Sequence, residues 1–398
     1  MKSKPRFSRR RLVLLAFVAV CLLFGTAGLL HTRASAQEAW EPFIPQADHT
    51  ALDVLTCGGR TFAKVKLTFN DGGYRVVDWG QAVRSGSDFS ADIKAERWTG
   101  ISIQVITFAE RVYDLGTLAP GTYTFTLTSR GTPVKSRQFV VGSASAAASN
   151  PADDASVFVW QHYQDFLGRD PDAQGFQFWT RNMTTCGADA ACAERKRVDT
   201  SAAFFLSIEF QETGFLVHRL YRASYGRMPR REEFLTDARA VSRGVVVNAP
   251  GWETLLADNT RALVEAWVNR PEFKFAFDQL TDAQFVDRLA ANAGITLDGA
   301  TREGLVLDLS AGRQTRAGAL RAIAEDADFR RREFGPAFVL MQYFGYLQRN
   351  PDEGRDHDMS GYNFWLSKLN QFGGDYQKAE MVRAFIESDE YRARFCGQ

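Results

Sequence analysis

The sequence predicts a two-part fold, in which an all-β sandwich of the immunoglobulin or fibronectin kind precedes an all-α array of about four helical repeat units. Two observations carry this prediction. Apolar residues alternate with polar ones between residues 50 and 142, which is typical of half-buried strands, and they follow helical spacing after residue 155. In addition, one short motif of the helical part returns near the C-terminus.

Composition limits the classes of function. The chain has 398 residues, which suggests two to four domains, and 45% of them are hydrophobic. Its 48 basic and 47 acidic residues leave a net charge of +1. A nearly neutral chain offers no electrostatic reason to expect nucleic acid or an anionic membrane as its main partner.

Residues 1–36 are predicted to be a signal peptide. A basic segment is followed by the apolar run Leu12–Leu30 and by a small-x-small cleavage site at Ala34–Ala36. Cleavage before Gln37 would leave no transmembrane segment and an extracytoplasmic protein, whether secreted, periplasmic or bound at the cell surface. The alternative is an uncleaved anchor, since the run is long enough to span a bilayer.

The cysteines fit an oxidising compartment. Cys186 and Cys192 are close in sequence and are predicted to form a disulfide that staples a small loop between helices. Cys57 and Cys396 either pair and tie the chain ends together or remain buried thiols. A zinc site is disfavoured, because no second pair of Cys or His residues stands at ligand spacing.

The β domain is predicted over residues 50–142. Segment 61–69 alternates Phe62, Val65, Leu67 and Phe69 with polar residues, and segment 88–98 alternates Phe89, Ala91, Ile93 and Ala95 with polar residues. These patterns predict half-buried antiparallel strands. Residues 121–141 are predicted to form a hairpin that turns near Arg130-Gly131. The small, polar segment 143–154 is predicted to be a linker.

Four helical units are predicted, at residues 155–213, 214–275, 280–330 and 336–396, of which the middle two are degenerate. The first and last units share a motif, whose matching residues are Arg169, Pro171, Asp172 and Trp179 in one and Arg349, Pro351, Asp352 and Trp365 in the other. In the last unit an insertion separates the two halves of the motif. Such repetition predicts units that cover one another's apolar faces.

The motif is interpreted as a brace between helices. Gly168 suits a left-handed C-cap, Asp170 an N-cap and Pro171 the first helical position. Asp172 and Asp352 fall in the first turn, where a carboxylate complements the helix dipole. Arg169 and Arg349 are expected to bond the preceding helix or that aspartate. The ring pairs Phe178/Trp179 and Phe364/Trp365 are expected to pack on a tyrosine stripe.

These residues carry a resemblance. The stretch "YQDFLGRDPDAQGFQFW" resembles the domain of unknown function numbered 4214 (DUF4214), a helical module of bacterial secreted and surface proteins. The stretch "FIESDEYRARF" is faintly similar to the repeat of phycobilisome linker polypeptides. The first resemblance covers residues 157–210 and 338–395. It implies an all-helical, non-catalytic, extracytoplasmic module for adhesion or surface assembly.

The sequence gives little reason to expect an enzyme, because it has no metalloprotease, nucleophile-elbow, P-loop or dinucleotide motif. His162 and His218 lie by the apolar stripe and are interpreted as packing residues. The acidic segment 352–361 contains weak candidates for calcium ligands, namely Asp352, Asp356 and Asp358, but their spacing is not that of an EF-hand. We therefore predict no catalytic residues, no cofactor and no enzyme.

The sequence thus predicts a secreted, non-enzymatic structural or binding module of unknown ligand. A cell-surface glycan or protein is the expected partner. The alternative is a glycan-binding or carbohydrate-active extracellular protein, which would use the sandwich face around Trp79 and Trp98 or segment 352–361.

Overall fold

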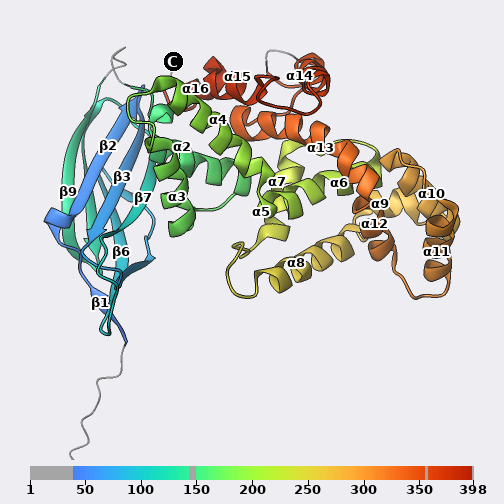
Figure 1. The fold of residues 1–398 in the computed structure, drawn as a ribbon, viewed down its shortest axis with the longest axis horizontal. Helices are drawn as coiled ribbons and strands as arrows, with labels where there is room; N and C mark the ends of the chain where they lie inside the picture. The colour runs from blue at the N-terminus through green and yellow to red at the C-terminus, as the bar shows by residue number, and fades with distance from the viewer. Residues whose placement is uncertain (1–38, 143–148, 355–356, 397–398) are drawn as a thin grey trace, which may run out of the picture.

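The computed structural model describes residues 39–142, 149–354 and 357–396 (Figure 1). Strands occupy residues 40–141 and helices residues 155–393, as predicted, and the β region lies at one end of the elongated helical region. The predicted signal peptide, most of the predicted linker and Asp356 lie outside the described residues.

The β region is a sandwich of two sheets. One sheet has the order β1-β6-β8-β9, with β4 and β5 also paired to β6, and the other has the order β2-β3-β7. Every pair is antiparallel except β6 with β8, which is parallel and departs from the predicted antiparallel sheet. The strands are β1 (Trp40–Phe43), β2 (Thr50–Cys57), β3 (Arg60–Phe69), β4 (Tyr74–Asp78), β5 (Val83–Ser85), β6 (Asp88–Trp98), β7 (Thr107–Thr117), β8 (Gly121–Ser129) and β9 (Thr132–Val141).

Alternation places the sandwich core as predicted in β6, where Phe89, Ala91, Ile93 and Ala95 are buried and the residues between them are mostly exposed. The predicted hairpin is β8–β9. Its two turn residues, Arg130 and Gly131, both have positive φ, of 50° and 79°. Two consecutive left-handed residues suit the right-handed twist of a two-residue hairpin.

Strand β3 is half-buried as predicted from Lys64 onward, but at its start Thr61, Phe62 and Ala63 are buried on both faces. Val65, Leu67 and Phe69 belong to the core between the sheets. Phe62, which the alternation grouped with them, points the other way and joins the helical core, with its ring 6.2 Å from those of Trp160 and Phe395. Helices cover the outer face of this sheet around Phe62, and the two regions therefore share apolar packing there.

The helical region winds away from the sandwich and returns to it, so that its last helices lie beside its first ones (Figure 1). Two helices are prolonged by wide π-helical turns, η3 and η4. The elements are η1 (Ala47–His49) in the sandwich, then η2 (Pro151–Asp153), α2 (Ala155–His162), η3 (Tyr163–Leu167), α3 (Ala173–Thr184), α4 (Ala190–Leu206), α5 (Ile208–Glu212), α6 (Gly214–Tyr225), α7 (Arg231–Ser242), α8 (Trp252–Trp267), α9 (Pro271–Phe277), α10 (Asp282–Ala293), α11 (Gly299–Ser310), α12 (Arg316–Ala324), α13 (Ala327–Gln342), η4 (Tyr343–Leu347), α14 (Ser360–Gln371), α15 (Met381–Glu387) and α16 (Asp389–Ala393).

A disulfide between Cys57 and Cys396 joins the sandwich to the end of the helical region, with Cα atoms 4.6 Å apart. This resolves the open choice for these two cysteines in favour of pairing. Cys186 and Cys192 form the second disulfide, which closes the loop between α3 and α4. Among the described helices, none is both long and apolar enough to cross a membrane.

Candidate functional site

The motif arginine of the first predicted unit lies in a corner of helices. Arg169 donates from Nε and Nη2 to the two carboxylate oxygens of Glu209, each over 2.7 Å. Its guanidinium carbon lies 5.1 Å from the centre of the Tyr163 ring. Burial by itself would lower the pKa of Arg169, but the hydrogen bonds and charge of Glu209 outweigh it and raise that pKa. The arginine therefore stays charged and braces η3 against α5.

The same corner occurs twice more. In the last predicted unit, Arg349 donates to Glu390 over 2.6 Å and lies 5.3 Å from the ring of Tyr343. In the second, Arg227 lies 5.2 Å from the ring of Tyr221 and bonds Glu233 over 2.8 Å, with Glu272 at 3.4 Å. In each corner a tyrosine face and a carboxylate enclose the guanidinium, an arrangement that holds a cation in place.

The helix before each corner ends in a left-handed residue. Gly168, as predicted, has φ 64°, and Gly226 ends α6 with φ 68°. Gly294 ends α10 in the same way, with φ 63°, although Ile295 and not an arginine follows it. In the last predicted unit the position is Gln348, with φ 57°. Its side-chain amide donates to the carbonyl oxygens of Phe344 and Gly345 over 3.1 and 2.7 Å, which satisfies groups at the helix end.

The roles predicted for the aspartates are partly wrong. Asp172, not Asp170, caps α3, by accepting a 2.7 Å hydrogen bond from Gly175 N. Asp170 instead pairs with Arg111 of β7 over 2.7 Å and so links the two regions. Pro171 accordingly precedes the cap and does not occupy the first helical position.

In the last predicted unit the insertion moves the start of the following helix. Helix α14 begins at Ser360, so Asn350-Pro351 does not open a helix and Asp352 lies in no first turn. Asp352 pairs with Arg230 of the second predicted unit over 2.7 Å. The insertion has therefore turned a capping position into a contact between units.

The motif aromatics divide into packed and exposed rings. Trp179 and Trp365 are half-buried, with ring centres 6.1 Å from Phe204 and 5.7 Å from Phe385. Their neighbours Phe178 and Phe364 are exposed, at 61% and 58%. Packing was thus predicted well for the tryptophans and wrongly for the phenylalanines.

Both histidines near the apolar stripe are buried. His162 Nε2 is 2.9 Å from Ser201 Oγ, and Ser201 Oγ bonds the Tyr346 hydroxyl. Burial lowers the pKa of His162 to about 3, so its imidazole is neutral at ordinary pH. His218 Nε2 is 3.0 Å from Glu333 Oε2. With exposures of 1% and 0%, neither ring reaches solvent, so neither is placed to act on a substrate.

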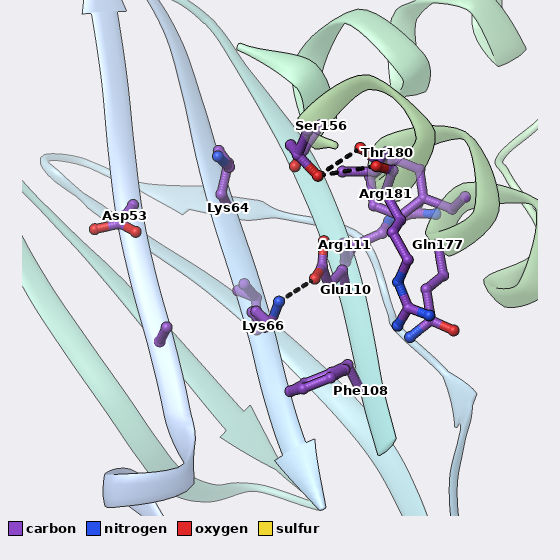
Figure 2. Close-up of a pocket in the computed structure, with 14 residues that line it drawn as sticks. Asp53, Lys64, Lys66, Phe108, Glu110, Arg111, Ser156, Gln177, Thr180 and Arg181 are labelled. Atoms are coloured by element: carbon purple, nitrogen blue, oxygen red, sulfur yellow. Dashed lines mark hydrogen bonds and ion pairs between the residues drawn. The ribbon is translucent and has the colours of Figure 1, made fainter. Parts of the chain in front are cut away.

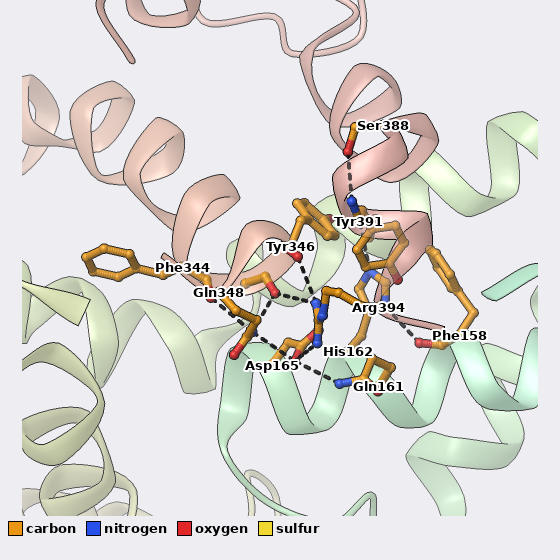
Figure 3. Close-up of polar contacts among 12 residues, drawn as sticks. Phe158, Gln161, His162, Asp165, Phe344, Tyr346, Gln348, Ser388, Tyr391 and Arg394 are labelled. Carbon is orange, nitrogen blue, oxygen red and sulfur yellow. Dashed lines mark hydrogen bonds and ion pairs between the residues drawn. The ribbon is translucent and has the colours of Figure 1, made fainter. Parts of the chain in front are cut away.

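The polar network around His162 joins the first and last predicted units (Figure 3). Asp165 accepts hydrogen bonds from Gln161 at 2.8 Å, from Gln348 at 3.1 Å and from both terminal nitrogens of Arg394 at 2.9 Å. Arg394 also donates to the carbonyl oxygen of Tyr346. These saturated contacts fix how the two units meet and leave little room for a ligand.

An open polar cleft lies between the sandwich and α3 (Figure 2). It has a volume of about 340 Å³. On its sheet side Lys66 pairs with Glu110 over 2.7 Å and lies 4.4 Å from the ring centre of Phe108. Gln177 and Arg181 extend from α3 along its other side.

Two buried atoms at this cleft, Arg111 Nε and Thr180 Oγ1, have no hydrogen-bond partner. Buried polar atoms usually find one, so these two atoms are exceptions at the base of the cleft. The sequence analysis missed this cleft because its walls come from five separate elements, β2, β3, β7, α2 and α3. No pattern within any one of these segments marks it.

The predicted acidic segment is engaged with protein partners. Glu353 bonds Arg230 over 2.6 Å and Asn350 N over 3.0 Å, and Asp358 accepts from Ser360 N over 2.8 Å. Asp356 lies outside the described residues. Within residues 39–142, 149–354 and 357–396, no three His, Cys, Asp or Glu side chains gather in a way that would hold a metal ion.

The two tryptophans proposed for glycan binding have different surroundings. Trp79 packs against the sandwich core, and its carbonyl oxygen accepts a 2.7 Å hydrogen bond from Tyr113. Trp98 lies at the end of β6, where its ring centre is 5.4 Å from that of Trp40. Trp79 thus contributes to the sandwich core and Trp98 to an aromatic pair with Trp40, and glycan binding by this face stays a prediction.

Comparison with known proteins finds one family, which matches the last predicted unit. The family described as "Domain of unknown function (DUF4214)" matches residues 336–395. This confirms the resemblance predicted for that segment, and the resemblance of residues 157–210 stays a prediction. No curated protein and no solved structure matches the chain.

Proposed function

We propose that this chain is an extracytoplasmic, non-enzymatic structural or binding protein, whose helical region consists of four related units and holds the β-sandwich in place. The observation that carries this proposal is the pairing of Arg169 with Glu209 and of Arg349 with Glu390. These charged side chains form ion pairs with one another, as expected of a structural brace and not of a site that binds a substrate.

Three further observations support the parts of this proposal. Two disulfides suit an oxidising compartment. Left-handed helix ends occur at Gly168, Gly226, Gly294 and Gln348, one in each of the four proposed units. Finally, both histidines that could serve a catalytic centre, His162 and His218, are sealed from solvent.

Unfolding experiments on Arg169→Ala and Arg349→Ala test the proposal. A brace loses stability when its arginine is removed, because the partner carboxylate is left unpaired. Groups of an active site are commonly held at the expense of stability, so their removal leaves the free energy of unfolding unchanged or raises it. Unchanged or increased stability in both variants would contradict the brace, and with it the non-enzymatic function.

A second candidate function is binding of a glycan or another small polar ligand in the cleft between the sandwich and α3. The polar and charged side chains that line the cleft, among them Lys66, Gln177 and Arg181, favour it. A glycan array with the intact protein tests this function. Binding should be lost in Gln177→Ala/Arg181→Ala and kept in the control Arg288→Ala, which changes an exposed arginine of α10 far from the cleft. Equal binding by both variants would exclude the cleft.

A further inference from the structure

The loop between β6 and β7, residues 99–106, exposes an unusual amount of aliphatic surface. Its sequence is "TGISIQVI", and four side chains are largely in solvent: Ile101 at 95%, Ile103 at 71%, Val105 at 48% and Ile106 at 61%. Contiguous apolar surface of this kind on a folded domain marks a place where something binds.

The loop is held in position by the rest of the sandwich. Gly72 N donates to Ile103 O over 2.9 Å, Ser102 Oγ donates to Asp71 Oδ1 over 2.8 Å, and Thr107 Oγ1 donates to Asp71 O over 2.9 Å. With its polar groups anchored inward in this way, the loop presents its isoleucines outward as part of the fold.

Two tryptophans adjoin these aliphatic side chains. Trp40 and Trp98 line an open depression together with Ile101 and Ile103. The guanidinium carbon of Arg75 lies 4.0 Å from the centre of the Trp40 ring. Tryptophan beside aliphatic residues, with arginine at the edge, is the composition found where proteins meet the boundary between water and lipid.

The described chain also begins at this end of the sandwich, the lower end in Figure 1. Ala39 N donates to Thr99 Oγ1 over 2.9 Å, and Thr99 N donates to Ala39 O over 3.0 Å. The apolar run Leu12–Leu30 precedes Ala39 by residues 31–38, which span at most about 27 Å when extended. In the uncleaved alternative, a bilayer that holds this run therefore lies within reach of the loop.

We propose that loop 99–106, with Trp40 and Trp98, is a membrane-contacting tip that inserts its aliphatic side chains into the surface of a lipid bilayer. Charges beside it are balanced: Arg75 pairs with Glu96 over 2.7 Å, and Glu41 lies opposite Arg97 in the β1–β6 register. Attraction is therefore apolar and needs no anionic lipid, in keeping with the net charge of +1. This tip is independent of the proposed scaffold role.

Flotation with vesicles of pure phosphatidylcholine tests the tip, using the chain that starts at Gln37. This form keeps every described residue and lacks the apolar run, so binding reports on the folded protein. We expect it to float with the vesicles, and we expect the partition coefficient of Ile101→Ser/Ile103→Ser to fall by roughly tenfold or more. The matched control Leu307→Ser/Phe275→Ser, at side chains 62% and 93% exposed in the helical region, should bind like the parent.

Three results would overturn the proposal. The first is a parent protein that does not float with phosphatidylcholine. The second is an equal loss of binding in the tip and control variants. The third is a dimer, seen by sedimentation equilibrium without vesicles and abolished by Ile101→Ser/Ile103→Ser, since the tip would then bind a second copy of the chain. Melting curves of both variants should match the parent, because all four side chains are exposed.

Discussion

Arg169 and Glu209 meet through two parallel hydrogen bonds, each 2.7 Å long, and the Glu209 side chain is only 6% exposed. The corresponding pair of Arg349 with Glu390 has similar geometry, but Glu390 is 44% exposed. Water screens the second pair and competes for its carboxylate. Two copies of one contact therefore differ in the stability that they contribute.

Glu209→Ala should lower the free energy of unfolding by about 2–3 kcal/mol, because it removes a buried carboxylate that accepts two hydrogen bonds from Arg169. Glu390→Ala should cost about 1 kcal/mol or less, because this carboxylate is exposed and Arg349 keeps its hydrogen bonds to the carbonyl oxygens of Asn350 and Glu353. Urea unfolding of both variants gives the comparison. Equal losses of stability would show that burial of the carboxylate does not decide how much each ion pair contributes.

The same type of experiment should distinguish the tryptophans of the motif from the phenylalanines beside them by the stability that each variant loses. Trp179→Ala and Trp365→Ala remove rings packed on Phe204 and Phe385, and we expect each to cost about 2–3 kcal/mol. Phe178→Ala and Phe364→Ala, which change the exposed neighbours, should stay within about 0.5 kcal/mol of the parent. A tryptophan variant that unfolds like its phenylalanine control would contradict the packing.

The two disulfides offer a matched comparison of loop length. Cys57 and Cys396 are separated by 339 positions, and Cys186 and Cys192 by 6. Because a longer loop restricts the unfolded chain more, Cys57→Ala/Cys396→Ala should cost about 3–5 kcal/mol and Cys186→Ala/Cys192→Ala about 2 kcal/mol. Denaturant unfolding without reductant measures both. The reverse order would mean that the link between the two regions does not stabilise the folded chain in this way.

Stability should fall as the pH falls below neutrality. Burial lowers the pKa of His162 to about 3, whereas an unfolded histidine has a pKa of about 6.5. Between these values the unfolded chain binds a proton that the folded chain excludes, so His162 alone should cost about 2 kcal/mol between pH 7 and pH 5. Burial also lowers the pKa of His218, in the same destabilising direction.

The variant His162→Gln isolates this effect, since it cannot take up the proton. Its free energy of unfolding should depend less on pH between 7 and 5 than that of the parent, by about 2 kcal/mol over the interval. Parallel pH profiles for the two proteins would show that His162 is protonated in the folded state and that its burial is incomplete.

Local patterns predicted much of the fold. Alternation in residues 88–98 predicted β6, and Arg130-Gly131 predicted the β8–β9 turn, because each depends on neighbours in the chain. Features that depend on distant partners were not predicted. An aspartate before a proline is a good helix cap. Nothing near Asp170 in the sequence reveals that it forms an ion pair with Arg111 of the sandwich instead.

The candidate sites were predicted less well than the fold. The cleft beside α3 combines segments that are far apart in the sequence, and only folding brings Arg111 to Thr180. The exposed tip was missed for another reason. Ile101, Ile103 and Val105 alternate with polar residues, as in a half-buried strand. The sequence does not reveal that this segment is a loop whose apolar side chains stay exposed.

The bond between Cys57 and Cys396 also decides how the molecule would respond to mechanical force. Tension applied between β1 and the C-terminal residues passes directly across the two sulfur atoms, and the 339-position span between them remains slack. The helices are then shielded from stretching, whatever pulls on the ends of the chain. Reduction of this single bond would transfer the load onto the helical region and let it extend.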